Sequence, residues 1–190
     1  FRDNPEGWQL VSGIWSPFYI QLRPLSSYPQ SKKILTRVGT VVGRMILEEI
    51  PDANKLVGIA SAGIPIVIAA TIFSGIPSCY TRKLEGAKTI EHFKNRLAQY
   101  GEHALVEGQI EDNANLVLVD DLVTKFDSKV IALEQVKYEI RRREAISSQL
   151  NTTCKHVAVL LDREQGATKM AEQLGLTLHS LIPFKTKGIT

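Results

Sequence analysis

Apolar and polar residues alternate along the chain in blocks that predict strands and helices in turn. Short apolar runs typical of buried strands lie at residues 55–60, 78–81, 116–119, 156–161 and 177–182. Residues 64–73 are apolar nearly all round and predict a buried helix, and residues 167–174 predict another. Val130, Leu133, Val136 and Ile140 recur at helical spacing. Strand–helix alternation predicts an α/β protein with a doubly wound, mostly parallel sheet.

Two polar stretches fit this alternation less well. Ile90, Phe93, Leu97 and Tyr100 follow helical spacing, so we expect a helix with a weak apolar stripe there. Residues 141–153 continue or follow a helix and contain few apolar residues. We interpret both stretches as surface insertions, and long connections of this kind are usually functional or mobile.

Composition narrows the class of protein. The chain has 190 residues, 44% of them hydrophobic and 23% charged, which suits one globular domain with a sizeable core. The net charge of +3 is mild and spread out, so we expect no nucleic-acid partner. The apolar stretch at residues 64–73 is about half of a bilayer span, and no signal-peptide pattern opens the chain. Cys79 and Cys154 are expected to be buried, reduced thiols, so we predict a cytoplasmic protein without a membrane anchor.

Chemically useful side chains follow several of the predicted strands. Since ligands bind beyond the carboxyl ends of parallel strands, these residues are candidates for a site. They are Asp120, Asp121, Thr124, Ser61, Ala62, Gly63, Arg82, Lys83, Asp162, Arg163 and Glu164. Carboxylates suit sugar hydroxyls, and cations with helix N–H groups suit phosphates. Each piece alone also fits a plain turn, a helix cap or a surface ion pair.

Several motifs, in order, resemble those of orotate phosphoribosyltransferases. They are WQLVSGIWSPFYIQLR at 8–23, the strand–turn–helix at 58–77, the pair Arg82-Lys83, LVEG at 105–108, LVLVDDLVT at 116–124 and VAVLLDREQGA at 157–167. The last motif, with LHS at 178–180, is most similar to the orotate phosphoribosyltransferase half of uridine monophosphate synthase. The resemblance covers nearly the whole chain, and its first and last motifs are the most specific.

The resemblance implies a type I phosphoribosyltransferase-like fold with a small N-terminal hood. Residues 1–50 would form the hood and a helix, and residues 51–190 the core of a single domain. The implied activity transfers ribose 5-phosphate from phosphoribosyl pyrophosphate to orotate in pyrimidine biosynthesis, giving orotidine 5′-monophosphate and pyrophosphate. Mg²⁺ would be held through the substrate rather than directly by protein side chains. A homodimer and a fused orotidine 5′-monophosphate decarboxylase domain are implied partners. The chain begins at Phe1 rather than Met, which fits either a fragment of a longer polypeptide or a processed chain.

The resemblance also assigns roles to individual residues. The catalytic residues would be Asp120, Asp121 and Lys83. Phosphoribosyl pyrophosphate would bind to Arg82, Lys83, Lys88, Asp120, Asp121, Thr124, Lys125 and Ser128. Orotate would bind to Ser12, Gly13, Phe18, Tyr19, Thr124 and Arg163, with the planar guanidinium of Arg163 on the carboxylate of orotate.

The phosphate loop departs from the family pattern. Phe126 stands where the family usually has glycine, whose missing Cβ lets the backbone approach a phosphate. Asp127 adds a negative charge beside the expected phosphate. The family's short mobile loop is also interrupted by the predicted helix near residues 90–100. These departures motivate a second hypothesis, a catalytically impaired module with a binding, regulatory or partner-stabilising role. A third hypothesis is a phosphoribosyltransferase with a different acceptor base.

Overall fold

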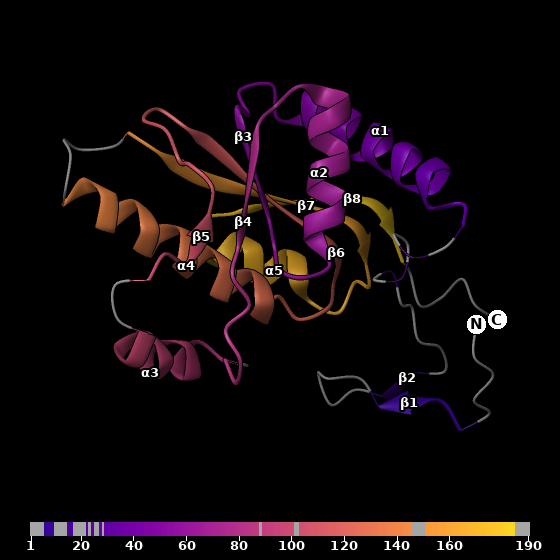
Figure 1. Ribbon diagram of the computed structural model, residues 1–190. Helices are drawn as coiled ribbons and strands as arrows, with labels where there is room; N and C mark the ends of the chain where they lie inside the picture. Colours follow the sequence, from indigo (N-terminus) through magenta and orange to yellow (C-terminus); the bar gives the residue numbers. More distant parts are fainter. Residues whose placement is uncertain are drawn as a thin grey trace.

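The fold is built on a six-stranded sheet (Figure 1). The computed structural model describes residues 6–9, 15–16, 22, 24, 27, 29–87, 89–100, 103–145 and 151–184. In spatial order the strands are β5 (Val106–Glu107), β4 (Ser78–Thr81), β3 (Lys55–Gly58), β6 (Asn115–Val123), β7 (Thr153–Asp162) and β8 (Thr177–Pro183). All neighbours are parallel except β5, which runs antiparallel to β4. The central strand β3 is buried along its whole length, as expected for a parallel sheet covered on both faces.

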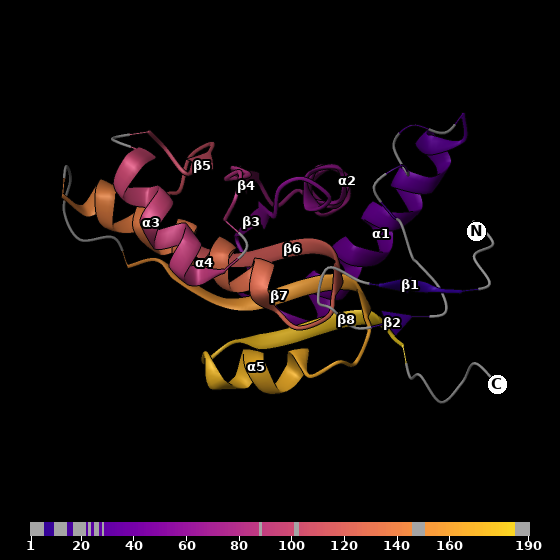
Figure 2. The ribbon, with the colours of Figure 1, turned by 90° about the horizontal axis from the view of Figure 1, so that it is seen from below.

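Helices cover both faces of the sheet (Figure 2). On one face, α1 (Ser31–Glu49) and α2 (Gly63–Ser74) pack their apolar side chains onto β3, β6 and β7. On the other face, α4 (Asp127–Glu144) and α5 (Ala167–Gln173) close a second apolar cluster. Gly39 and Gly43 let α1 approach α2 closely. A Cβ at Gly39, for example, would stand 2.3 Å from the carbonyl oxygen of Ala69.

The remaining elements lie outside the sheet. The helix α3 (Ile90–Tyr100) packs beside α4 through a small apolar cluster that includes Leu84, Phe93 and Leu105 (Figure 1). The short strands β1 (Trp8–Gln9) and β2 (Trp15–Ser16) pair antiparallel with each other. Both strands lie within residues 1–50, the range for which the sequence predicts a hood and a helix.

The predicted elements are confirmed, with corrections to the ends of two strands and one strand that was missed. The strand expected at residues 116–119 runs from Asn115 to Val123, so Asp120 and Asp121 lie inside the end of the strand rather than after it. In the same way, Asp162 is the last residue of β7. The sequence pattern also failed to predict β5, because a two-residue strand has no periodicity. The helix expected around Ile90–Tyr100 is α3, and residues 141–144 continue α4.

Two further expectations concern thiols and membranes. Cys79 and Cys154 are both free cysteines, as predicted, but only Cys79 is a buried residue and Cys154 is half-buried. Burial of the two thiols raises their pKa to about 11 and about 12. Within the described ranges, none of the helices has the length and apolar character that a membrane span requires.

Candidate functional site

The candidate residues converge on one edge of the sheet. Gly58, the last residue of β3, lies opposite both Tyr80 of β4 and Val119 of β6, so the acidic pair begins one residue beyond the level at which β3 ends. On the next strand, the backbone N–H of Arg163 donates to the carbonyl of Val123 at 3.1 Å. The strand order therefore brings the cations after β4, the acids of β6 and Arg163 after β7 to a common edge.

Two adjacent carboxyl groups lie at the end of β6. Asp120 and Asp121 are only 6% and 9% exposed. Asp120 Oδ1 accepts the backbone N–H of Asp121 at 2.9 Å, and Asp121 Oδ1 accepts the N–H of Leu122 at 2.8 Å. Burial, followed by the neighbouring charge of Asp120, raises the pKa of Asp121 to about 6. Asp121 therefore changes charge near neutral pH rather than in strong acid.

A buried lysine lies beside this pair. Lys129, in the first turn of α4, donates from Nζ to Asp120 Oδ2 at 2.8 Å and to the carbonyl of Leu122 at 2.5 Å. The sequence analysis did not single out Lys129. The available signal was its position in the helical series with Ala132, Leu133 and Val136, which puts its side chain on the sheet-facing side of α4.

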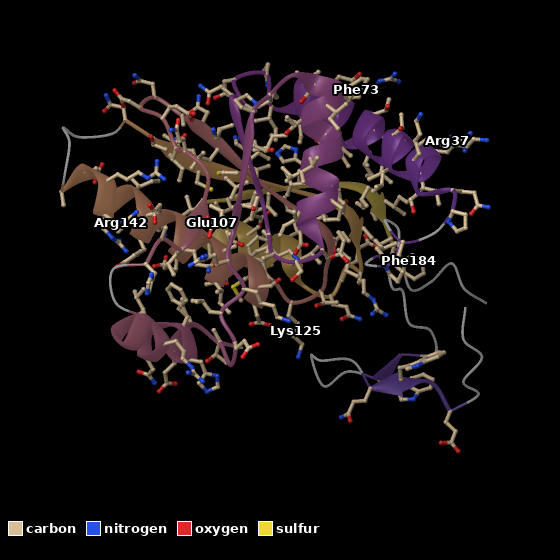
Figure 3. The ribbon with its side chains drawn as sticks, viewed as in Figure 1. Arg37, Phe73, Glu107, Lys125, Arg142 and Phe184 are labelled. Atoms are coloured by element: carbon tan, nitrogen blue, oxygen red, sulfur yellow. The ribbon has the colours of Figure 1, made fainter. Side chains whose placement is uncertain are left out.

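The loop between β6 and α4 forms the start of a helix. Phe126 has a φ of 83° and lies just before α4, a conformation that favours glycine. Its side chain is 1% exposed and belongs to the apolar cluster under α4 and α5. The Phe126 ring therefore lies in the core rather than on the exposed side of the loop. Thr124 is half-buried, and Lys125, Asp127 and Ser128 are exposed. Figure 3 labels Lys125 at the lower edge of the sheet, where α4 begins.

A cleft of about 390 Å³ opens beside the ends of β3 and β4. Its lining residues come from the turn after β3, from α2 and from the β4–β5 side: Ala60, Ser61, Ile64, Tyr80, Thr81, Arg82, Lys83 and Glu107. Arg82 Nε lies 2.5 Å from Glu107 Oε1 in a half-exposed ion pair. Glu107 was not a predicted site residue. The motif LVEG contained it, but nothing in the sequence placed β5 next to β4.

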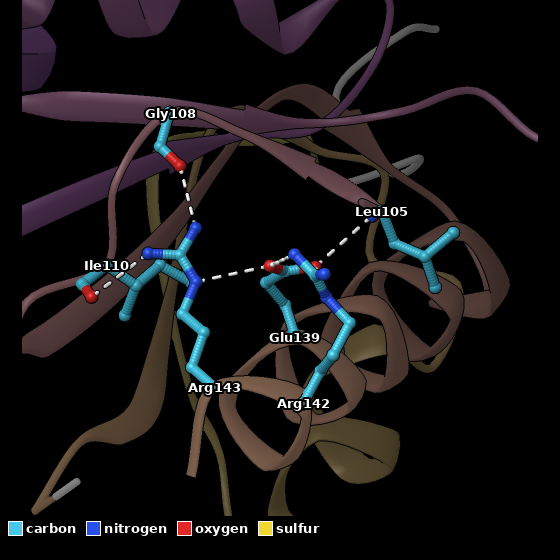
Figure 4. A network of polar contacts seen from close by, with 6 residues as sticks. All are labelled: Leu105, Gly108, Ile110, Glu139, Arg142 and Arg143. Atoms are coloured by element: carbon cyan, nitrogen blue, oxygen red, sulfur yellow. Dashed lines mark hydrogen bonds and ion pairs between the residues drawn. The ribbon is translucent and has the colours of Figure 1, made fainter. Parts of the chain in front are cut away.

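The helix α4 holds this side of the site in place. Gln135 Nε2 donates to the carbonyl of Arg82 at 2.7 Å, and Arg82 N–H donates to the carbonyl of Leu105 at 2.9 Å. Glu139, which is fully buried, accepts the N–H of Leu105 at 3.3 Å and hydrogen bonds from Arg142 and Arg143 (Figure 4). Burial acts to raise the pKa of Glu139, but the hydrogen bonds from the two arginines outweigh it and the pKa is lowered. Arg82 and Lys83 therefore follow a strand that α4 anchors.

Arg163 is a buried cation at the end of β7. Arg163 is 5% exposed, and burial lowers the pKa of its guanidinium from the ordinary value. The preceding Asp162 accepts the N–H of Glu164 through Oδ1 at 2.8 Å, which shapes the turn into α5. A buried guanidinium is a suitable partner for a planar carboxylate.

Some predicted site residues lie outside the described residues. These are Ser12, Gly13, Phe18, Tyr19 and Lys88. Among the residues that the structure does describe, no three His, Cys, Asp or Glu side chains group together as ligands for a metal ion.

Comparison with known proteins defines the class and then the family. No protein-family model matches the chain. Among solved structures, the orotate phosphoribosyltransferase of Aeropyrum pernix superposes with a TM-score of 0.67 at 23% identity, covering 94% of this chain and 86% of that one. The fold is thus that of the type I phosphoribosyltransferases.

Sequence relatives specify the family. The orotate phosphoribosyltransferase of Saccharolobus solfataricus is 30% identical over 175 residues, which is 90% of this chain and 73% of that protein. The uridine 5′-monophosphate synthase of Caenorhabditis elegans is 29% identical over 180 residues, and the match spans 94% of this chain but only 31% of that protein. The chain belongs to the orotate phosphoribosyltransferase family.

Proposed function

We propose that the protein transfers ribose 5-phosphate from phosphoribosyl pyrophosphate to orotate, releasing pyrophosphate and forming orotidine 5′-monophosphate. The observation that carries this proposal is the convergence of the acidic pair, Arg82-Lys83 and Arg163 on one edge of the sheet in a member of this family. No observation favours the hypothesis of a catalytically impaired module. The core position of the Phe126 ring removes one argument for it.

Each part of the substrate pair is assigned to a part of the site. Asp120 and Asp121 act on the ribose, where positive charge develops during transfer. The start of α4, with Thr124, Lys125 and Ser128, receives the 5′-phosphate, because helix N-termini present N–H groups to anions. Lys83 and Arg82 neutralise the leaving pyrophosphate, and Arg163 receives the carboxylate of orotate.

Residues outside the described part of the chain complete this assignment. We propose that Lys88 assists at the pyrophosphate, and that Ser12, Gly13, Phe18 and Tyr19 close over the orotate ring. We propose that Mg²⁺ enters with the phosphate oxygens of the substrate, where it supplies charge neutralisation.

We also propose a homodimer that uses the outer face of α2 (Ile68, Ile72 and Phe73). The helix contains no charged residue, and Ile72 is 81% exposed. A helix that is apolar all round is normally covered, and an uncharged apolar patch complements a second copy of itself. Ile64, on the same helical row as Ile68, lines the cleft, so the second copy would lie close to the site.

Two further assignments follow from the relatives and the cysteines. The synthase relative is about three times as long as its matched segment, which supports a fused decarboxylase domain as a partner in the whole protein. Two unpaired thiols support a cytoplasmic location.

The test of the proposed activity is the loss of orotate absorbance with phosphoribosyl pyrophosphate and Mg²⁺. We expect turnover by the wild type, and a fall in kcat/KM of roughly 10²–10³-fold for Lys83→Gln because a cation facing the leaving group is removed. Lys32→Gln, which removes an exposed lysine at the start of α1, is the matched control and should keep the wild-type rate. A wild-type protein that binds both substrates without consuming orotate would contradict the proposed activity.

A further inference from the structure

Lys129 has its hydrogen-bonding capacity filled by the protein itself. The residue is 3% exposed, and its ammonium group donates to Asp120 Oδ2 at 2.8 Å, to the carbonyl of Leu122 at 2.5 Å and to Ser128 Oγ at 3.3 Å. A lysine ammonium has three protons to donate, and these three acceptors use them all. Lys129 is thus an internal cation rather than a ligand for a substrate anion.

This cation divides the acidic pair into two unlike members. Asp120 uses Oδ1 for the N–H of Asp121 and Oδ2 for Lys129. Asp121 uses Oδ1 for the N–H of Leu122. Within the described part of the chain, Asp121 Oδ2 accepts no hydrogen bond. The geometry therefore leaves an acceptor on Asp121 and occupies both oxygens of Asp120.

We propose that Lys129 is a positioning residue, which holds Asp120 against α4 and compensates its charge, so that Asp121 is the acid that presents an unengaged carboxylate oxygen to the ribose. As far as the ribose is concerned, this inference rests on the proposed function. The inference goes beyond the proposed function because it gives the two acids different roles. It also adds Lys129, to which neither the motifs nor the relatives assign a role.

The charges of Asp120, Asp121 and Lys129 give the physical reason for this role of the lysine. Two adjacent buried carboxyl groups do not both ionise readily, because each negative charge disfavours the other. Burial and Asp120 act to raise the pKa of Asp121, and the positive charge of Lys129 acts to lower it. With both acids ionised the trio carries one net negative charge instead of the two of the acids alone, so Lys129 favours the ionised form of Asp121.

Few other charged groups of the described structure lie close to the acidic pair. The turn between β3 and α2, which packs against the end of β6, brings only Ile59, Ala60, Ser61 and Ala62. On the other neighbouring strand, Asp162 and Arg163 lie level with and beyond Val123, further along the edge. Lys129 is accordingly the cation that the structure sets against the acidic pair.

The direct test is a pH titration of the aspartate side-chain carbons by NMR in the protein without substrates. In Lys129→Met the pKa of Asp121 should rise by about one unit or more relative to the wild type, and Lys129→Arg should largely restore it. Lys137→Met removes a lysine from the same helix whose partner is Glu134, and it should leave Asp121 unchanged. A titration of Asp121 that is the same in Lys129→Met and the wild type would overturn the proposal.

A measurement on the wild type covers the case in which Lys129→Met does not fold. The ammonium protons of Lys129 should exchange slowly with water at neutral pH, and the ¹⁵N signal should shift as the acidic pair takes up protons. A fast-exchanging Lys129 ammonium, with a signal indifferent to that titration, would refute the internal ion pair.

Activity then separates this inference from the proposed function. With orotate and phosphoribosyl pyrophosphate, Lys129→Met should move the acid limb of the kcat/KM profile upward by about one pH unit. If the wild type is active and the limb does not move, the role of Lys129 is wrong and the proposed function stands. If the wild type does not consume orotate, the proposed function fails, and the NMR titration still decides the role of Lys129.

Discussion

At the scale of single residues, the environment of Asp121 determines the charge of its carboxyl group. Its carboxyl group is buried next to another carboxyl group, so its ionised form is disfavoured in the folded protein. Phe126 is a second case at this scale, in which burial stabilises an unusual backbone conformation. It holds a backbone conformation that suits glycine, and the burial of its ring in the core compensates for that conformation. In both cases the local environment outweighs the ordinary preference of the residue.

Asp121→Asn should stabilise the protein at neutral and alkaline pH. The folded-state pKa of about 6 lies above the ordinary 3.8, so the contribution of Asp121 to stability is fully present below about pH 3.8 and is lost as pH rises through about 6. Since asparagine does not ionise, the variant should exceed the wild type by roughly 1–3 kcal/mol near pH 8 and lose this advantage near pH 4. Urea unfolding at several pH values measures the difference. Glu91→Gln, at an exposed position on α3, serves as control, and a pH-independent difference for Asp121→Asn would contradict the expectation.

At the scale of elements, α4 connects the separate parts of the site. Its first turn carries Lys129 to the acidic pair, its middle carries Gln135 to the carbonyl of Arg82, and its last turns carry Glu139 to Leu105. Arg143 extends this last contact to the carbonyls of Gly108 and Ile110 (Figure 4). One helix therefore supports the phosphate loop and the cationic side of the cleft together.

Glu139→Ala should destabilise the protein by roughly 2–3 kcal/mol. The change leaves the buried N–H of Leu105 without its acceptor and removes the shared partner of two partly exposed arginines. Glu134→Ala is the matched control on the same helix, because the Glu134–Lys137 pair is more exposed and should contribute less than about 0.5 kcal/mol. Urea unfolding compares the two variants. Equal midpoints would mean that the Glu139 cluster does not hold the β5 segment.

At the scale of the whole molecule, the outer face of α2 is an apolar surface that the described fold leaves exposed. The inner face of the helix packs on the sheet through Ile66, Val67 and Ala70, whereas Ile68, Ile72 and Phe73 are exposed. Ile64 continues the exposed row to the cleft, so the proposed interface and the proposed site share one helix.

Ile72→Asp should convert the proposed dimer into a monomer with little effect on folding. The change puts a charge at the centre of an apolar contact, where it would face its own copy across the two-fold axis. Analytical ultracentrifugation measures the mass in solution, and circular dichroism checks that the fold is kept. Met170→Asp makes the same kind of change at an exposed apolar residue of α5 and should stay dimeric. A wild type that sediments as a monomer at all concentrations would refute the interface.

Much of the framework could be predicted from the sequence, because it depends on short-range patterns. The apolar runs predicted β3, β4, β6, β7 and β8, and the helical spacings predicted α2, α3, α4 and α5. The strand-end rule predicts Asp120, Lys83 and Arg163 at one edge of the sheet, where they lie, although their chemical roles stay predictions. The boundaries were less accurate, since the acidic pair is part of β6.

The sequence by itself determined the alternation of elements, the edge that carries the charged groups and the motifs of the family. Only the tertiary structure decided that Lys129 bonds to Asp120, that Glu107 pairs with Arg82 and that the Phe126 ring lies in the core. The physical reason is that periodicity reports which face of an element is buried, whereas each of these contacts depends on how elements distant along the chain, or a loop and the core beneath it, are packed in space.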